Sequence, residues 1–177
     1  MEIPQLDTPR LILRAHRLDD FPAFAAAWAE PDVVRYIGGK PSTERESWMR
    51  MLTFGGLWPA LGYGYWAIEE RSTGGYVGQV GLADFHREID PAIAGVPEAG
   101  WVLAPAFHGK GYATEAMQAV LAWADARGLT ERSVCIIDPA NAASVRVAEK
   151  CGYREFARTQ FGDGDVVMLE RVVSVVP

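Results

Sequence analysis

Residues 101–115 read WVLAPAFHGKGYATE, which passes from an apolar run through a turn with two glycines into a helical pattern. Glycine readily adopts positive φ, so Gly109 and Gly111 allow backbone amides to converge and a ligand to approach closely. The helix expected from Tyr112 onward would direct its positive end and its unpaired N–H groups at the same place. The stretch predicts a strand, a turn and a helix, with a pyrophosphate as the natural occupant of the turn.

Glycine also occurs in strand-to-helix turns that bind nothing, so the neighbouring residues must decide between the known phosphate motifs. A Walker A loop needs GxxxxGK followed by Ser or Thr, whereas Lys110 stands between two single glycines and Tyr112 follows them. A Rossmann turn lies near the first strand and has a third glycine, whereas residues 109–114 come late and lack it. A triphosphate site and a dinucleotide site are therefore both disfavoured.

The segments around this stretch alternate between strand and helix patterns. Apolar and aromatic runs bounded by turn residues predict strands, and Ala-rich or acid-started stretches predict helices. Before residue 98 we expect a strand at 11–14, a helix at 18–30 stopped by Pro31, a helix from Ser42 to Gly55-Gly56, a loop to Gly64, and a hairpin of strands 65–70 and 76–85. After it we expect a strand at 99–103, a helix from the glycine turn to Arg127, a strand at 133–137, a helix at 142–151, and strands at 153–159 and 166–173. The order predicts an α/β fold, a mixed sheet with helices on both faces.

The chain has 177 residues and a net charge of −6, with 23 acidic against 17 basic residues. A chain of this length can bury a core without disulfides or a structural metal, so we expect one domain over residues 1–177. The acidic balance disfavours nucleic acid as a partner, because binding to a phosphate backbone needs a basic face. It agrees better with a cationic substrate, although acidic residues also serve to keep proteins in solution.

Cysteine, histidine and hydropathy patterns predict a cytoplasmic protein without a metal. Cys135 and Cys151 have no CxxC spacing, and three scattered histidines add no ligand pattern. The N-terminal residues lack the basic start and apolar run of a secretion signal, and no run of about 18 apolar residues occurs. We therefore expect no membrane association, and neither cysteine has the setting of a catalytic nucleophile.

Further motifs accompany the glycine turn, which reads GKGYATEA at 109–116. They are TPRLILR at 8–14, EAGWVL at 98–103, and the segment from Asn141 to Tyr153. Together these motifs resemble those of the GCN5-related N-acetyltransferases (GNAT), and within them the RimJ/RimL-like type that acetylates ribosomal proteins. The resemblance covers nearly the whole chain. It implies a single acetyltransferase domain with a twisted, splayed, mostly antiparallel sheet of about seven strands and about four flanking helices.

The resemblance also implies that acetyl-coenzyme A is the cosubstrate, with its pantetheine arm alongside Trp101, Val102 and Leu103. Such an arm carries amides that can pair with a strand, and a strand N–H could polarise the thioester carbonyl. The same three residues could instead be plain core residues of a central strand. The pyrophosphate contacts that the resemblance implies are His108, Gly109, Lys110, Gly111, Tyr112, Ala113 and Thr114.

Among the implied coenzyme contacts, His108 departs from the family pattern and Asn141 has a second possible role. The family pattern begins with Gln or Arg where this chain has His108, so we expect one weaker side-chain contact and an intact backbone cradle. Asn141 corresponds to a family asparagine that contacts the coenzyme, although Asn before an apolar helical run is also an ordinary N-cap. Both roles are compatible, because the side-chain oxygen can cap the helix while the amide donates to a ligand.

Direct transfer of an acetyl group requires a base for the amine and an acid for the leaving thiolate. Glu98 opens the strand beside the implied thioester position and is our first choice of base, with a water relay as the alternative. Further candidates at the end of the adjoining strand are Asp84, His86 and Glu88. Many relatives use a tyrosine as the acid, but Ala148 stands at that position, so the resemblance implies Ser144 in this role.

The acceptor would enter from the side opposite the coenzyme, past aromatic residues. Those that could line an amine pocket, or could equally be core residues, are Trp28, Tyr36, Trp58, Tyr63 and Tyr65. The resemblance implies a primary amine as acceptor, either a protein N-terminus or a small molecule.

The sequence alone leaves two other functions and the oligomeric state open. A noncatalytic acyl-coenzyme A binding or sensor module is the alternative, because positions 108 and 148 depart from the family pattern. A nucleotide-binding domain of an unrelated α/β type is disfavoured by the late glycine turn. A homodimer is implied by the resemblance alone, and the Val-rich segment 166–176 could be a core strand or a pairing edge.

Overall fold

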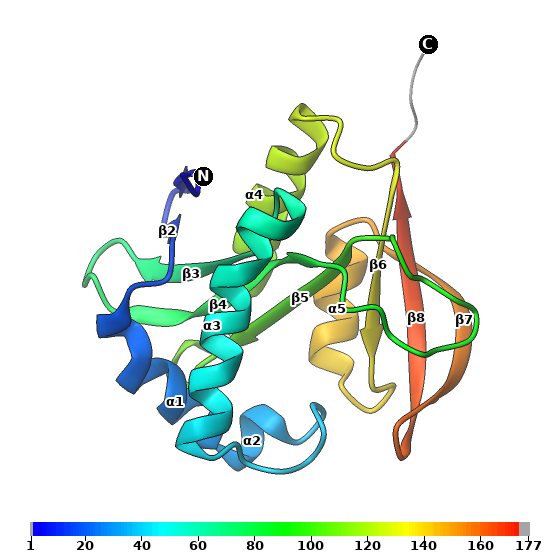
Figure 1. Ribbon diagram of the computed structural model, residues 1–177, viewed down its shortest axis with the longest axis horizontal. Helices are drawn as coiled ribbons and strands as arrows, with labels where there is room; N and C mark the ends of the chain where they lie inside the picture. Colours follow the sequence, from blue (N-terminus) through cyan, green and yellow to red (C-terminus); the bar gives the residue numbers. More distant parts are fainter. Residues whose placement is uncertain (1, 174–177) are drawn as a thin grey trace.

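The computed structural model describes residues 2–173, which form one twisted sheet with helices on both faces (Figure 1). Its eight strands lie in the order β1-β2-β3-β4-β5-β6-β8-β7. The strands are β1 (Leu6–Asp7), β2 (Leu11–Arg14), β3 (Tyr65–Glu70), β4 (Tyr76–Ala83), β5 (Glu98–Leu103), β6 (Arg132–Ile137), β7 (Arg154–Phe161) and β8 (Gly164–Val172). The α-helices are α1 (Phe21–Ala29), α2 (Pro31–Val34), α3 (Glu44–Leu61), α4 (Tyr112–Ala126) and α5 (Ala142–Lys150). All neighbouring strands are antiparallel except β5 and β6, so the predicted mixed, mostly antiparallel sheet is confirmed.

The structure has one strand and one helix more than we expected. Strand β1 is a two-residue edge strand paired with β2, and α2 is a single turn that begins at Pro31. Pro31 therefore ends α1, as expected, and starts the next helix, because proline fits the first helical position. Both extra elements are too short for a hydrophobic period to reveal.

Helix α3 is longer than predicted. We expected it to end at Gly55-Gly56 with a loop to Gly64, but it continues to Leu61 and ends at Gly62, whose φ is 80°. Phe54, Leu57 and Trp58 lie buried on one face across the two glycines, and this packing outweighs a propensity loss of roughly 1 kcal/mol per glycine. The helix also begins one residue later than expected, because Thr43, and not Ser42, forms a reciprocal capping box with Glu46.

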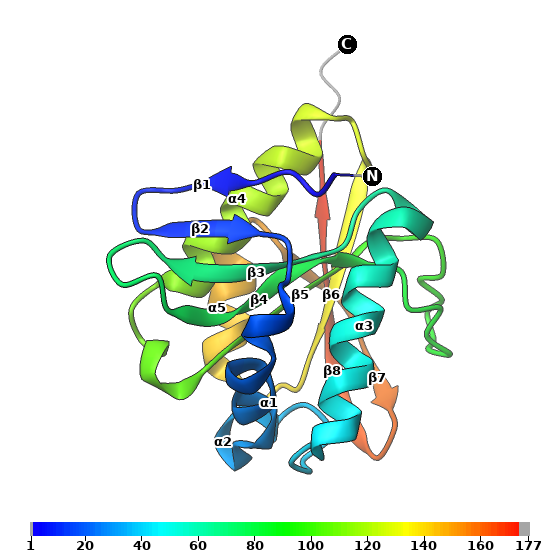
Figure 2. The same cartoon turned by 60° about the vertical axis from the view of Figure 1, so that its left-hand side comes forward.

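Two apolar layers hold the sheet between the helices. In Figure 2, α4 and α5 lie on one side of the sheet, and α1 and α3 lie on the other. Helix α4 buries Met117 and Val120 in the larger layer, at the i, i+3 spacing of one helical face. In the smaller layer, Phe24 of α1 and Phe54 of α3 pack with Tyr65 of β3. The active-site candidates lie where this smaller layer meets the middle of the sheet.

Strands β5 and β6 are paired only where they begin, through Glu98 and Val134 (Figure 1). Beyond this pair the two strands diverge, so the edge of β5 that faces β6 has no strand partner from Ala99 onward. The splayed sheet that the family resemblance implied is therefore present. Strand β8 lies between β6 and β7, which makes it an interior strand, and the part of the Val-rich segment from residue 174 onward lies outside the described residues.

In residues 2–173, no helix combines the length and the apolar character needed to cross a membrane. The same part of the chain contains no group of three or more His, Cys, Asp or Glu side chains placed to hold a metal ion. Both cysteines are buried free thiols.

Candidate active site

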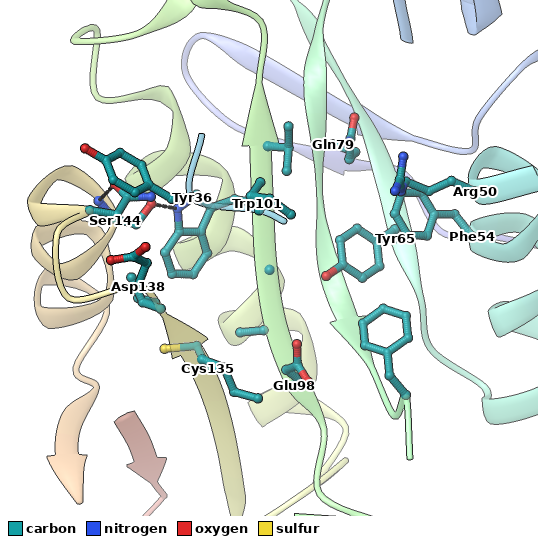
Figure 3. A pocket seen from close by; sticks show the side chains of 18 of the residues that line it. Tyr36, Arg50, Phe54, Tyr65, Gln79, Glu98, Trp101, Cys135, Asp138 and Ser144 are labelled. Carbon is teal, nitrogen blue, oxygen red and sulfur yellow. Dashed lines mark hydrogen bonds between the residues drawn. The ribbon is translucent and has the colours of Figure 1, made fainter. Parts of the chain in front are cut away.

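A cleft of about 510 Å³ opens where β5 and β6 diverge and extends beneath α1 and α3 (Figure 3). We call its two parts the β6 end and the α3 end. The β6 end is lined by Trp101, Val102, Asp138, Asn141 and Ser144. The α3 end is lined by Trp28, Arg50, Phe54, Tyr65 and Gln79. Glu98 lies between the two ends, so one continuous cleft joins the implied coenzyme residues to the implied acceptor side.

The glycine turn follows β5 and does not itself line this cleft. Gly109 and Gly111 have φ values of 73° and 77°, as the sequence predicts for glycines in a tight turn. In the described part of the chain, the backbone amides from Gly109 to Thr114 donate to no protein acceptor. These amides and the positive end of α4 form an open anion-binding cradle.

The N-terminal segment fixes the position of this turn. Arg10 donates from Nη1 to the carbonyl oxygen of Lys110 at 2.9 Å and from Nε to the Glu115 carboxylate at 2.6 Å. Thr8 donates to the same carboxylate at 2.7 Å. Although partial burial opposes it, the hydrogen bonds from Thr8 and Arg10 lower the pKa of Glu115. Residues 8–14, which are distant in sequence, thus hold residues 109–116 in place through hydrogen bonds.

His108 and Tyr112 both use their side chains inside the protein. Nε2 of His108 lies 2.8 Å from the carbonyl oxygen of Leu103, which holds the turn against the end of β5. Tyr112 donates its hydroxyl to Glu70 at 2.7 Å, and the Arg10 guanidinium lies over its ring. At these two positions a bound coenzyme would therefore contact the backbone and not the side chains.

Glu98 is buried and forms a two-point ion pair with Arg87, at 2.6 Å from Nε and 2.8 Å from Nη2. The pair crosses from the loop after β4 to the first residue of β5, and both side chains line the cleft. Arg87 is a functional candidate that the sequence does not indicate, although it lies between the candidates His86 and Glu88. No local pattern couples positions 87 and 98, because a loop of irregular structure separates them.

The three further base candidates lie outside the cleft lining. Asp84 accepts from the backbone amides of His86 and Gly95, at 3.0 and 2.9 Å, so its carboxylate braces the loop after β4. His86 is exposed and lies 3.3 Å from Asp84, and Glu88 is exposed. Geometry therefore favours Glu98 among the four.

Ser144 and Asn141 lie together at the start of α5. Asn141 accepts from the backbone amide of Ser144 at 3.1 Å, which confirms its role as the N-cap of this helix. The indole of Trp101 donates to the Ser144 hydroxyl at 3.3 Å (Figure 3). Because an indole can only donate, this hydroxyl accepts, and its own proton is free for a group in the cleft. Ala148, one turn further along α5, is fully buried in the core.

Tyr65 also places its hydroxyl in the cleft. Its ring stacks on Phe54 with centroids 4.3 Å apart, and its oxygen lies so close to Gly100 of β5 that a Cβ there would collide with it. Burial raises the pKa of Tyr65, so the phenol stays protonated. Of the other aromatics proposed for an amine pocket, Trp28 and Tyr36 line the cleft, whereas Trp58 is buried against Trp66 and Tyr63 does not reach the cleft.

Cys135 also lines the cleft, from β6. Burial raises the pKa of the Cys135 thiol, and burial also raises the pKa of the Cys151 thiol, to about 11. Both side chains are therefore thiols and not thiolates at neutral pH, in agreement with the prediction that neither is a nucleophile.

Comparison with known proteins identifies the family. A family model described as the acetyltransferase (GNAT) domain matches residues 10–154. The uncharacterised protein YkkB of Bacillus subtilis is 33% identical over 159 residues, which are 84% of this chain and 84% of that protein. An acetyltransferase from Agrobacterium tumefaciens strain C58 is 30% identical, with a TM-score of 0.82 over 97% of this chain and 95% of that one.

A more distant structure shares the fold. RimL, a ribosomal L7/L12 α-N-protein acetyltransferase solved in complex with coenzyme A, has a TM-score of 0.79 over 96% of this chain and 98% of that one. Its identity to this chain is 18%, so the likeness concerns the fold alone. The family match, the splayed sheet and the open glycine cradle agree, and the chain belongs to the GNAT family of acetyl-coenzyme A dependent N-acetyltransferases.

Proposed function

We propose that this enzyme transfers the acetyl group of acetyl-coenzyme A directly to a primary amine that enters at the α3 end of the cleft. The observation that carries the proposal is the continuous cleft, which joins a buried carboxylate to a free hydroxyl and to the unpaired edge of β5. Acetyl-coenzyme A supplies an activated acetyl group that an amine can attack without an acyl-enzyme stage.

The described residues fit this cosubstrate in three places. The edge of β5 from Ala99 to Leu103 has unpaired backbone groups that can bind the amides of an extended pantetheine arm. The free amides of residues 109–114 suit a pyrophosphate. The side-chain amide of Asn141, whose oxygen caps α5, has two N–H donors left for the coenzyme.

We assign the base to Glu98. Each of its oxygens accepts one hydrogen bond from Arg87 and keeps a second lone pair, so the carboxylate can still accept the proton of an incoming amine or of a bridging water. Arg87 fixes the plane of the carboxylate and acts as a positioning residue. A carboxylate held in one orientation loses little freedom when the amine arrives.

We assign the acid to Ser144. Its hydroxyl proton is free because Trp101 occupies one of its lone pairs, and it lies at the β6 end, where the thiol of the coenzyme would leave. The proton that Ser144 gives to the thiolate can be restored from the proton that the amine releases, so the transfer is balanced.

The acceptor that we propose is a protein N-terminal α-amine or a small-molecule amine. An α-amine has a pKa of about 8 and a lysine amine one of about 10.4, so a site with a single carboxylate as base favours the former. RimL, which shares this fold, is described as an α-N-protein acetyltransferase, and this agrees with the proposal without deciding it.

Thermal unfolding with acetyl-coenzyme A, NAD or ATP tests the coenzyme assignment. A ligand at 100 times its Kd adds about 2.7 kcal/mol to the free energy of unfolding, which raises the Tm of a domain of this size by roughly 5 to 10 °C. We expect this rise for acetyl-coenzyme A alone. Thiol release during incubation with a panel of amines then tests the transfer. Coenzyme binding without thiol release for any amine would instead support the noncatalytic binding module.

A further inference from the structure

Besides the hydroxyl of Tyr65, the α3 end of the cleft contains three side chains with nitrogen donors, which come from three different elements. Trp28 lies on α1, Arg50 on α3 and Gln79 on β4, and all three side chains line the cleft. Figure 3 shows Arg50 and Gln79. The mechanism proposed above uses none of them.

Gln79 is fully buried, and part of its side-chain amide has no partner. Its Oε1 accepts from the hydroxyl of Tyr76 at 2.6 Å, whereas Nε2 has no acceptor among the described residues. Tyr76 has no other acceptor in that part of the chain, and this orients the oxygen toward Tyr76. A buried amide nitrogen without an acceptor is unfavourable, so a ligand with an oxygen atom at this position would satisfy it.

Trp28 and Arg50 form a stacked pair beside it. The Arg50 guanidinium lies 3.8 Å from the centroid of the Trp28 ring and donates to the Ser42 hydroxyl at 2.9 Å. The indole nitrogen of Trp28 is buried and has no acceptor within residues 2–173. Stacking on an indole holds a guanidinium in one plane, which suits two-point binding of a carboxylate.

The charge of Arg50 is not balanced by a protein carboxylate. The other arginines that are at least partly buried, Arg14, Arg87, Arg132 and Arg171, all have an acidic partner within 4.0 Å. Across the described chain Arg50 has none; its guanidinium donates to the Ser42 hydroxyl, and burial lowers its pKa without removing its charge. Glu46, one turn earlier on α3, is the acid that faces it, and that carboxylate accepts from the backbone amide and from the hydroxyl of Thr43.

The acidic side chains elsewhere in the cleft already accept hydrogen bonds from other parts of the protein. Glu98 is paired with Arg87, and Asp138, at the β6 end, accepts from the backbone amide of Ala140 at 2.8 Å. The α3 end is therefore a donor-rich, positively charged compartment inside a protein of net charge −6. Such a compartment attracts an anion and repels a polyamine or any other acceptor with several positive charges.

We infer that the acceptor amine also carries a carboxylate, which the stacked Arg50 guanidinium binds together with the free donors of Gln79 and Trp28. This inference rests on the proposed function and specifies its substrate class. The carboxylate can belong to a free amino acid or to an acidic side chain near a peptide N-terminus. In both cases the amine points toward Glu98, and the carboxylate lies at the far side of the α3 end.

Matched acceptors test this inference by thiol release from acetyl-coenzyme A. One arm compares amino acids with their carboxamides and with the corresponding decarboxylated amines. A second arm compares C-terminally amidated peptides that begin with Asp or Glu with those that begin with Asn or Gln. We expect the carboxylate member to have the higher kcat/KM in at least one arm, and the arm in which it does identifies the source of the carboxylate.

Variants connect the preference to these residues. We expect Arg50→Gln to reduce the ratio of kcat/KM between the carboxylate member and its neutral counterpart by about 10- to 100-fold, the range of a charged hydrogen bond. Arg50→Lys should retain part of the preference, because it keeps the charge and loses the planar fork. Arg45→Gln, which removes an exposed arginine from the same helix, is the matched control and should behave like the wild type.

A binding measurement keeps the inference testable if turnover is slow. N-acetylated amino acids and their carboxamides are titrated calorimetrically into the protein saturated with coenzyme A. Equal affinities, or equal kcat/KM for carboxylate and carboxamide, would overturn the carboxylate site and leave acetyl transfer to neutral amines intact. Failure of acetyl-coenzyme A to raise the Tm would instead count against the proposed function itself, so the two failures are distinguishable.

Discussion

Among the candidate bases, Glu98 differs from the others because its carboxylate lies in the cleft and is held there by a guanidinium. We expect Glu98→Gln to lower kcat by about 100-fold or more, since a positioned base contributes roughly 10²- to 10⁴-fold. The Tm shift with acetyl-coenzyme A should remain. Steady-state kinetics and thermal unfolding measure both effects.

Glu98→Gln also removes the ion pair with Arg87, so its effect on stability needs a control. Glu98→Gln leaves the Arg87 charge partly buried and unpaired, which can destabilise a protein by up to about 3 to 5 kcal/mol. The double variant with Arg87→Gln removes both charges and should regain stability but not activity. Recovery of the rate together with the stability would mean that Glu98 acts through the fold and not as a base.

Ser144 allows a cleaner substitution, because its backbone and not its side chain completes the cap of α5. We expect Ser144→Ala to lower kcat by roughly 100-fold, near the lower end of what a general acid contributes. The Tm should fall only by about 2 to 4 °C, because the Trp101 indole loses one hydrogen-bond acceptor. Ser144→Thr keeps the hydroxyl and should retain most of the rate. If Ser144→Ala has the wild-type kcat, the Tyr65 phenol becomes the candidate acid, because it lies in the cleft and burial keeps it protonated.

Two helix ends provide a comparison between a structural glycine and a binding glycine. Gly62 ends α3 with a φ of 80°, and Gly111 precedes α4 with a φ of 77°. An alanine in this left-handed region costs about 1 to 2 kcal/mol at either position, which lowers the Tm by roughly 2 to 8 °C. We expect both alanine variants to lose this stability. Only Gly111→Ala should also weaken acetyl-coenzyme A binding. Calorimetric titration with the coenzyme measures this affinity. Equal affinities in the two variants would contradict the proposal that the turn at residues 109–114 binds the pyrophosphate.

The helices and strands differ in how far their sequence predicts them. Strand β5, the glycine turn and α4 follow from the residues themselves, because period, turn chemistry and helix start agree over residues 98–126. The end of α3 does not, since Gly55-Gly56 is a local stop signal and the burial of Leu57 and Trp58 depends on the rest of the fold. The same holds for the candidate site. Glu98 could be predicted from its strand, but its Arg87 partner and the Arg50 stack depend on contacts between distant segments.

For the protein as a whole, net charge is a poor guide to the field inside the cleft. The sequence, with its charge of −6, agreed better with a cationic substrate. Most acidic side chains of the described chain are exposed or paired with arginine, whereas the α3 end of the cleft holds an arginine without an acidic partner within 4.0 Å. Because screening weakens interactions with distant surface charges, the nearest buried group determines which acceptor is attracted.

The stability of the fold should depend on pH through His16, which packs against Phe24 and Phe54 in the smaller apolar layer. Both ring nitrogens are buried and have no partner in residues 2–173, and this burial lowers the pKa of His16 from 6.5 to about 4. Between these values the unfolded chain binds a proton that the folded chain does not, so the free energy of unfolding falls as the pH falls from 6.5 to 4. The loss attributable to His16 is at most about 3 kcal/mol. Asp20 titrates in a more acidic range. Burial opposes its ionisation, but the hydrogen bonds from Arg14 and from the backbone amide of Arg17, together with the charge of Arg14, lower the pKa of Asp20 below 3.8. The stability that Asp20 contributes is therefore lost only below this pH. We expect the free energy of unfolding of His16→Leu to change less between pH 6.5 and 4 than that of the wild type. Urea unfolding at a series of pH values measures this dependence. Parallel curves for the variant and the wild type would show that His16 is not the titrating group.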